Sequence, residues 1–251
     1  MSGFRHDVDA QGIAEVVLDK PPVNALNGRE WLDLAALLRR LSDDESVRVV
    51  VIRAEGRGFC AGVDIKELAQ DGSQLPMVER GNYLTFKAVW ECRVPVLCAV
   101  HGFVLGGGVG ISGAADGVFA ADDAYFGLPE VDRGALGAST WLVRMFGQQK
   151  ARMLFFRAAR ITAPEAYRLG ALEKVVPRDQ LVEAVREYAG EIAAKSPRAV
   201  ELAKESMNLI EYPDPARMYR TEQGFTAELY LSNDSLEARR AFVEKREARF
   251  E

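Results

Sequence analysis

The segment GFVLGGGVGISGAAD, residues 102–116, decides how the surrounding chain folds. Gly106, Gly107 and Gly108 interrupt an apolar stretch, although glycine costs about 1 kcal/mol relative to alanine inside a helix. The preceding VPVLCAVHG suits a buried strand, and VGISGAAD can begin a helix. The glycines therefore predict a strand-to-helix turn whose unpaired N–H groups could bind a phosphate or an oxyanion, with a simple packing turn as the alternative.

The rest of the chain alternates strands and helices. Residues 13–18, 47–53 and 117–121 are rich in apolar and β-branched side chains, whereas residues 29–44 repeat apolar residues at helical spacing. After Leu136 the pattern is almost wholly helical, and Thr162 with Glu165 predicts a capping box for a short helix that Gly170 ends. This order predicts an α/β fold with a largely parallel sheet. We expect an α/β core over residues 1–195 and a helical region over residues 196–251.

Composition excludes several classes of function. The net charge is −5 and acidic and basic residues are interspersed, so no nucleic-acid partner is expected. The first residues form no apolar signal region and no run approaches the ~20 residues that span a bilayer, so we expect no membrane association and a cytoplasmic location. Three cysteines without metal or disulfide spacing also fit a reducing compartment.

The few histidines and cysteines predict no metal site. His6 and His101 are too few for a histidine-rich centre, and a structural role for His101 is favoured over a catalytic one. Cys60, Cys92 and Cys98 are interpreted as small buried apolar residues.

A second glycine turn precedes the first, in AEGRGFCAGVDIKEL, residues 54–68. Asp64 is predicted to cap a helix there, with Glu67 at the third helical position. Both turns would lie at the carboxyl ends of parallel strands, on the rim where open α/β folds bind ligands. One N–H from each turn could hold the same oxygen, which is the arrangement of an oxyanion hole suited to a thioester enolate.

At this point the motifs CAGVDIKEL, HGFVLGGGVG, FGLPEVDRG, ITAPEAYRLGALEKVV and AFVEKREARF fall in the order seen in one family. The chain resembles the crotonase, or enoyl-CoA hydratase/isomerase, superfamily over nearly its whole length. The resemblance implies a core of repeated ββα units and helices that build a homotrimer or homohexamer. It also implies an acyl-CoA thioester substrate, with coenzyme A as part of the substrate and no metal or redox cofactor.

The resemblance assigns residues to roles. It places the oxyanion-hole amides at Val63 and Gly107. It also implies that CoA binds near the segments that contain Asn24, Ala25, Ala61 and Asp64.

One of the two glutamates that hydratases of this family use is missing. The first position is Gly110 here, and only the second, Glu130, is kept. A positioned acid–base group contributes about 10²- to 10⁴-fold, so efficient hydration is not expected. A lone carboxylate could instead move a proton between carbons, as in the isomerases, or activate water against a β-diketone carbon. The second reaction needs room for water, which we expect at Gly110.

Asp132 and Arg133, which follow Glu130 closely, each have two possible roles. Asp132 could be a second catalytic carboxylate, or a solvated turn residue or partner of Arg133. Arg133 could bind a substrate carboxylate or form a plain salt bridge.

A narrower resemblance concerns FGLPEVDRGALGAST and YRTEQGFTAELYL. Both are similar to an actinobacterial subgroup that acts on CoA thioesters of steroid ring remnants, including a member that opens a ring by hydrolysis. Tyr219, Arg220, Glu222 and Gln223 would then shape the pocket, with an ordinary interface helix as the alternative.

Two rival functions stay open. Gly108, Gly110 and Gly113 spell G-x-G-x-x-G, which suggests an NAD-dependent enzyme, although the next strand-like run ends too early for the matching acid. A non-catalytic acyl-CoA-binding protein would explain the missing glutamate, but retention of Glu130 argues against it. We favour a C–C hydrolase, then an isomerase, over a hydratase.

Overall fold

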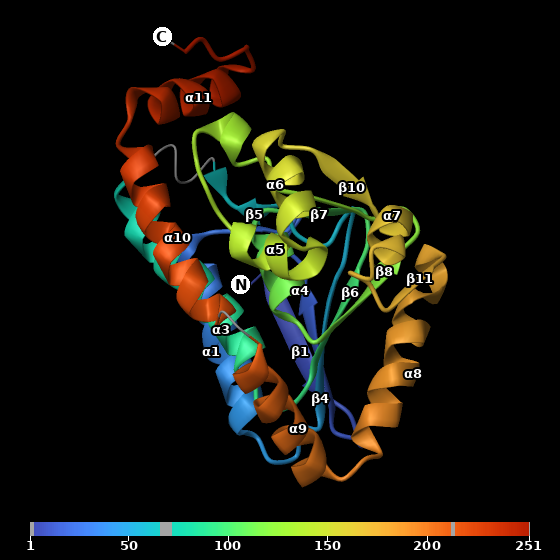
Figure 1. Cartoon of the computed structure of the whole chain (residues 1–251). Helices are drawn as coiled ribbons and strands as arrows, with labels where there is room; N and C mark the ends of the chain where they lie inside the picture. Colours follow the sequence, from blue (N-terminus) through green and yellow to red (C-terminus); the bar gives the residue numbers. More distant parts are fainter. Residues whose placement is uncertain (1–2, 66–71, 212–213, 251) are drawn as a thin grey trace.

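The computed structural model describes residues 3–65, 72–211 and 214–250, and its strands form three sheets (Figure 1). The largest has the order β1-β2-β4-β6-β8-β11, and the smaller ones are β10-β9-β7 and β3-β5. The strands are β1 (Phe4–Val8), β2 (Ile13–Leu18), β3 (Ala25–Leu26), β4 (Val49–Ala54), β5 (Gly62–Val63), β6 (Val96–Val100), β7 (Phe103–Leu105), β8 (Gly117–Ala121), β9 (Tyr125–Gly127), β10 (Arg160–Thr162) and β11 (Lys174–Val176).

Helices connect and cover these strands. They are α1 (Gly28–Asp43), α3 (Leu75–Trp90), α4 (Gly107–Ala114), α5 (Ser139–Phe146), α6 (Gln148–Phe156), α7 (Ala163–Arg168), α8 (Leu181–Ala193), α9 (Pro197–Ile210), α10 (Pro215–Tyr230) and α11 (Asn233–Glu244). Short 3-10 helices span Gly72–Gln74, Val131–Arg133 and Arg178–Gln180.

The large sheet is parallel except at its first strand. β2, β4, β6, β8 and β11 run parallel, whereas β1 pairs antiparallel with β2. The β-branched run of β4 is buried on both faces, as a central parallel strand requires. α8 covers one face of the sheet, and α1 and α3 lie on the other side (Figure 1). The predicted α/β fold with a largely parallel sheet is confirmed.

The small sheets bring the two glycine turns together. β7 leads directly into α4 through Gly106, whose φ of 54° and ψ of −115° suit glycine alone. β5 lies against this turn, because a Cβ added to Gly62 would come within 2.9 Å of the Gly107 nitrogen. The predicted strand-to-helix turn is confirmed, although the strand that enters it is β7 rather than the preceding β6.

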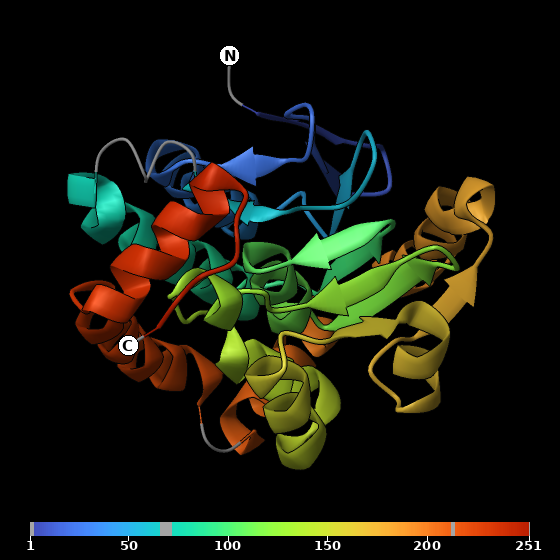
Figure 2. The same ribbon diagram turned by 90° about the horizontal axis from the view of Figure 1, so that it is seen from above.

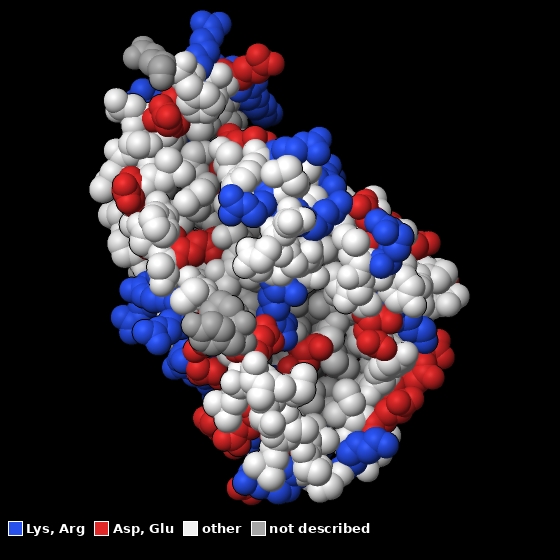
Figure 3. All heavy atoms as spheres, viewed as in Figure 1, with Lys and Arg blue, Asp and Glu red and all other residues white. Residues whose placement is uncertain are grey.

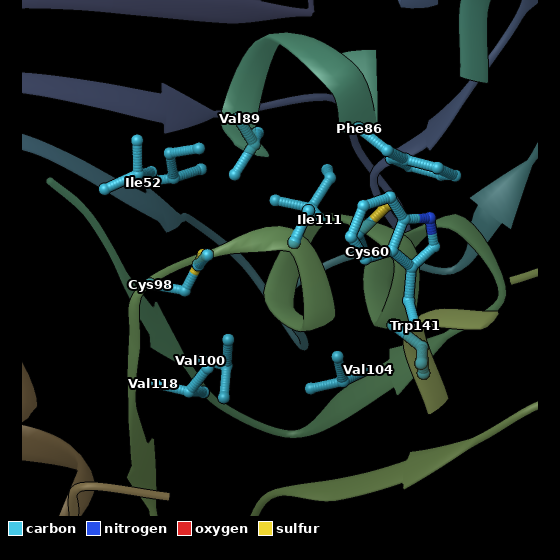
Figure 4. Close-up of a cluster of buried hydrophobic side chains, with 14 of the residues drawn as sticks. Ile52, Cys60, Phe86, Val89, Cys98, Val100, Val104, Ile111, Val118 and Trp141 are labelled. Carbon is cyan, nitrogen blue, oxygen red and sulfur yellow. The ribbon is translucent and has the colours of Figure 1, made fainter. Parts of the chain in front are cut away.

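The main hydrophobic core surrounds α4, and Figure 4 shows Phe86, Cys60, Ile111 and Trp141 lying together in it. The Phe86 ring on α3 packs edge-on against Trp31 and Trp141, with ring centroids 5.8 and 6.2 Å away. All eight residues of α4 are buried. Tightly packed aromatic side chains therefore support α4 and the glycine turn at its start.

The carboxy-terminal half is mainly helical, as predicted, but the sequence did not reveal β10 and β11. Thr162 is the N-cap of α7, yet its side chain forms no capping hydrogen bond, and Glu165 pairs with Lys150 instead, so the predicted capping box is wrong. Gly170, with φ of 79°, follows the end of α7 as expected.

Helix α10 lies alongside α3 in both ribbon views (Figures 1 and 2). Tyr219 from α10 belongs to the main hydrophobic core, so the helices after residue 195 pack on the α/β core rather than apart from it. The boundary at residue 195 stays a prediction.

The predicted helix cap at Asp64 was expected to include Glu67, and Glu67 lies outside the described residues.

The surface carries both signs of charge. On the face in Figure 3, acidic and basic side chains are interspersed. Among the helices in the described ranges, none is long and apolar enough to cross a membrane.

Candidate active site

A cavity of about 100 Å³ lies between the two glycine turns, α3, α10 and the segment after β9. Its walls include Val63, Gly106, Gly107 and Glu130. A buried water needs only ~10–15 Å³ of such space, so the cavity has room for several waters. The two turns and the retained glutamate are thus brought to one site.

Glu130 is held just before the 3-10 helix that follows β9. Its backbone oxygen accepts hydrogen bonds from the N–H groups of Arg133 (2.9 Å) and Ala135 (3.0 Å), which fix the turn. Its side-chain Oε2 is buried without a hydrogen-bond partner among the described residues. Burial raises the pKa of Glu130 to about 8, against the smaller opposing effects of a hydrogen bond from its own backbone N–H and of the Arg133 charge. Such a carboxyl can take up and release a proton near neutral pH.

The proposed oxyanion amides lie on the cavity wall. Gly107 is the first residue of α4, and the first N–H groups of a helix have no partner within it. Val63 follows Gly62 in β5, and the Asp64 N–H donates to Leu26 of β3 over 3.0 Å. Since successive N–H groups of a strand point to opposite edges, the Val63 N–H points away from β3. The oxyanion-hole role of Val63 and Gly107 stays a prediction.

Asp132 and Arg133 have different surroundings. Asp132 is exposed and lies outside the cavity, so the prediction of a second catalytic carboxylate there is wrong: the 3-10 turn points it to solvent. Arg133 lines the cavity, and its guanidinium carbon lies 4.5 Å from the centroid of the Phe242 ring on α11. The described ion pairs include none between these two neighbours. Arg133 is therefore placed to meet a ligand.

The four residues expected near CoA differ in whether they line the cavity. Ala61 lines the cavity, whereas Asn24, Ala25 and Asp64 do not. The Asn24 side chain instead accepts from the Lys20 N–H (2.7 Å) and donates to the carbonyls of Glu55 (2.9 Å) and Gly58 (3.0 Å). These hydrogen bonds fix the loop that carries Asn24. Its expected place near CoA stays a prediction. The roles of Ala25 and Asp64, whose carboxylate lies 3.9 Å from the Lys20 ammonium, stay predictions.

Helix α10 supplies part of the site. Tyr219 and Gln223 line the cavity, as the narrower resemblance implied. Arg220 donates to the Gln223 side chain over 2.9 Å. Glu222 does not reach the cavity, because its carboxylate accepts from the N–H groups of Ser139 (2.8 Å) and Thr140 (3.0 Å) at the start of α5.

Sequence reasoning missed two polar cavity residues on α3, Glu79 and Asn82. They lie three positions apart in α3, and no motif marks them.

Comparisons with known proteins identify the family. The sequence model of the enoyl-CoA hydratase/isomerase family matches residues 9–251. The chain belongs to the enoyl-CoA hydratase/isomerase family. A hydrolase of Rhodococcus jostii, named for (7aS)-7a-methyl-1,5-dioxo-2,3,5,6,7,7a-hexahydro-1H-indene-carboxyl-CoA, is 47% identical over 96% of this chain and 95% of its own. The Mycobacterium tuberculosis hydrolase of the same name is also 47% identical, over 93% and 96%.

Solved structures agree on the fold. An enoyl-CoA hydratase/isomerase from Pseudoalteromonas atlantica superposes with a TM-score of 0.89 at 27% identity, covering 99% of this chain and 100% of that one. The predicted crotonase fold is confirmed.

The resemblance places Gly110 at the position of the missing glutamate, and the structure shows how little space surrounds it. A Cβ added there would lie 2.2 Å from the Cζ of Phe86, and Gly110 does not line the cavity. The aromatic ring fills the volume of the absent side chain. Room for water therefore lies beside Glu130, and the expectation of a water site or substrate contact at Gly110 is wrong.

The remaining candidates are structural. Gly108, Gly110 and Gly113 lie inside α4 and pack on Cys60, Phe86 and Trp141, rather than forming the turn before the helix that a dinucleotide needs. His101 is buried with Nε2 3.1 Å from the Gly56 carbonyl oxygen, which confirms its structural role. The three cysteines are buried and free, as expected. Within the described ranges, no cluster of His, Cys, Asp and Glu could hold a metal ion.

The close approach of Gly106 to Glu130 gives a direct test of the site. A Cβ at residue 106 would meet Oε1 of Glu130 at 2.5 Å, so Gly106→Ala should displace the carboxylate. We expect kcat to fall by about 10²-fold, the cost of an ångström-scale misplacement. Gly170→Ala is the matched control, because Gly170 also has positive φ but has nothing within 4 Å of an added Cβ. Equal turnover of the two variants in a steady-state assay would contradict this placement.

Proposed function

We propose that this protein hydrolyses a ring C–C bond in the CoA thioester of a bicyclic diketone, of the kind left by steroid ring degradation. The observation that carries the proposal is the buried Glu130 carboxyl, whose pKa is raised and which lies in the cavity with Val63 and Gly107 of the two glycine turns. The two relatives at 47% identity, both named as hydrolases of a dioxo-indene-carboxyl-CoA, support the substrate class.

The proposed reaction uses Glu130 as base. Glu130 accepts a proton from water, whose oxygen forms a bond to a ring carbonyl carbon. The adjacent C–C bond then breaks, the carbonyl carbon becomes a carboxylic acid, and the electron pair moves by conjugation to the thioester. The N–H groups of Val63 and Gly107 stabilise the resulting enolate oxygen. Glu130 returns its proton to carbon, so one water is consumed and the carboxylate is regenerated.

The raised pKa of Glu130 sets the expected pH dependence. Only the ionised carboxylate can accept a proton, and its pKa of about 8 leaves most of it protonated at lower pH. We therefore expect kcat/KM to rise with pH through about 8 and then to level off. Steady-state rates measured between about pH 6 and 10, with spontaneous thioester hydrolysis subtracted, check this. A flat profile, or one that falls over this range, would contradict the role of Glu130.

A substrate panel separates the alternatives. Bicyclic dioxo-, 2-enoyl- and 3-enoyl-CoA esters are incubated with the protein and followed by mass spectrometry. Gain of one water with ring opening of the diketone supports the proposal. Rapid hydration of crotonyl-CoA or migration of a 3-enoyl double bond would favour a hydratase or an isomerase, and tight binding with no turnover of any ester would indicate an acyl-CoA-binding protein.

We further propose that the reaction needs no metal or redox cofactor, because water addition and C–C cleavage as written involve no net oxidation. We propose a homotrimer or homohexamer in the cytoplasm. Exposed apolar side chains on α9, α10 and the turn after it support assembly, with Leu209 79%, Phe225 59% and Leu231 90% exposed.

A further inference from the structure

The cavity carries more polar groups than the proposed reaction uses. Three buried side-chain oxygens in the described residues have no hydrogen-bond partner: Oε1 of Glu79, Oδ1 of Asn82 and Oε2 of Glu130. All three belong to residues that line this one cavity. The other unpartnered atoms are nitrogens of Trp31, Arg53 and Trp141. Because unpaired buried polar atoms are costly, their concentration here points to a polar ligand.

Glu79 and Asn82 form a pair on one face of α3. They are three residues apart, so their side chains lie side by side on the helix surface. The wall that carries them is fixed from α10, because the Gln223 amide donates to the backbone oxygen of Glu79 over 2.5 Å. Arg220 bonds to Gln223 and lies over the ring of Tyr83, 5.6 Å from its centroid. The helix wall that carries the two polar side chains is therefore fixed before a ligand arrives.

Resting on the proposed function, we propose that Glu79 and Asn82 hydrogen-bond to an oxygen on the ring of the acyl group, away from the thioester. The site thus selects oxygenated cyclic acyl groups over plain hydrocarbon chains. A neutral Glu79 can donate its acid O–H to a ring ketone, and Asn82 can donate its amide N–H. The unpaired Oδ1 of Asn82 can only accept, so a hydroxyl group on the ring would pair with it. Burial raises the pKa of Glu79, which favours this neutral form, while the Arg220 charge opposes the shift.

Exposed or paired carboxylates elsewhere show what is unusual about Glu79. Glu201 pairs with Arg93, Glu15 lies 3.0 Å from Arg53, and Glu222 caps α5. The structure gives Glu79 no such partner for its Oε1 among the described residues. An apolar acyl chain would leave that atom buried and unpaired, whereas a ring ketone would pair with its acid proton.

The test is a binding cycle that does not depend on turnover. Calorimetry measures the Kd of cyclohexanecarboxyl-CoA and of its 3-oxo counterpart, for the native protein and for Glu79→Leu, Glu79→Gln and Asn82→Leu. The native protein should bind the oxo ester roughly tenfold more tightly, as one or two net hydrogen bonds allow. Glu79→Leu should remove most of this preference, and Asn82→Leu part of it, with little change for the plain ester. Glu79→Gln should keep it, because the amide still donates.

The controls separate this inference from the proposed function. Glu91→Leu removes an exposed carboxylate just after α3 and should leave both Kd values unchanged. Glu79→Leu should stay folded in thermal unfolding, since it removes a buried unpaired oxygen. Equal preference for the oxo ester in the native protein and Glu79→Leu would overturn the inference, even where diketone hydrolysis is observed. A Glu79→Leu variant with lower kcat but unchanged Kd values would also overturn the inference, because Glu79 would then take part in the proton transfer. Absence of hydrolysis with an intact binding cycle would refute the proposed function and leave the inference standing.

Discussion

In the Glu130→Gln variant, kcat/KM for the diketone thioester should fall by about 10²- to 10⁴-fold, the usual contribution of a positioned base. Glutamine has nearly the same shape as glutamate but cannot accept a proton. The shape of the cavity should therefore be kept while the rate of the reaction falls. Binding of a CoA ligand measured by calorimetry should change little. The rise of the rate through pH of about 8 should disappear with the carboxylate.

Asp132→Asn is the matched control for this experiment. It removes a carboxylate two residues away that is exposed and outside the cavity, so its kcat/KM should equal that of the native protein. Turnover that survives in Glu130→Gln but is lost in Asp132→Asn would reverse the assignment of the base.

Introducing the hydratase glutamate by Gly110→Glu should destabilise the protein rather than confer hydration. The Cβ alone would lie 2.2 Å from the Phe86 ring, and a buried carboxylate would follow it. Overpacking costs about 1–3 kcal/mol and an unpaired buried polar group adds about 1–3 kcal/mol. For a chain of this size we expect Tm to fall by roughly 10 °C or the protein to become insoluble.

A second substitution shows whether the ring is the cause. Phe86→Ala opens the volume that the new side chain needs, so Gly110→Glu combined with Phe86→Ala should be more stable than Gly110→Glu alone. Gly190→Glu in α8 is the matched control, because an added Cβ there has nothing within 4 Å. It should change Tm by no more than a few degrees. A Gly110→Glu protein that melts at the native temperature would show that Phe86 does not fill this position.

Patterns local in the sequence predicted local structure well. The apolar spacing of residues 29–44 became α1, and the β-branched run became β4 with Val49–Ala54. The glycines of the turn predicted its position because backbone freedom is a property of one residue. The resemblance then identified Glu130 as the retained carboxylate, and the cavity contains it.

Features that depend on distant pairs could not be predicted in this way. Phe86 fills the space beside Gly110 across α3 and α4, and nothing near either residue records that contact. Asp132 and Glu130 are two residues apart, and only the 3-10 turn decides which one faces the cavity. Glu79 and Asn82 look like ordinary surface residues of a helix until α10 is packed against them.

The unpaired carboxyl of Glu130 has a consequence for directed evolution. Its pKa lies at about 8 in the fold against an ordinary 4.5, so the unfolded chain loses this proton at lower pH than the folded protein does. The free energy of unfolding therefore falls as pH rises from 4.5 to about 8 and then levels off. Selection of variants by heat challenge in mildly alkaline buffer would therefore enrich replacements at this position that resist heat and no longer turn over substrate. Directed evolution of a more heat-resistant enzyme from this chain therefore requires screening each variant for product formation as well as for resistance to heat.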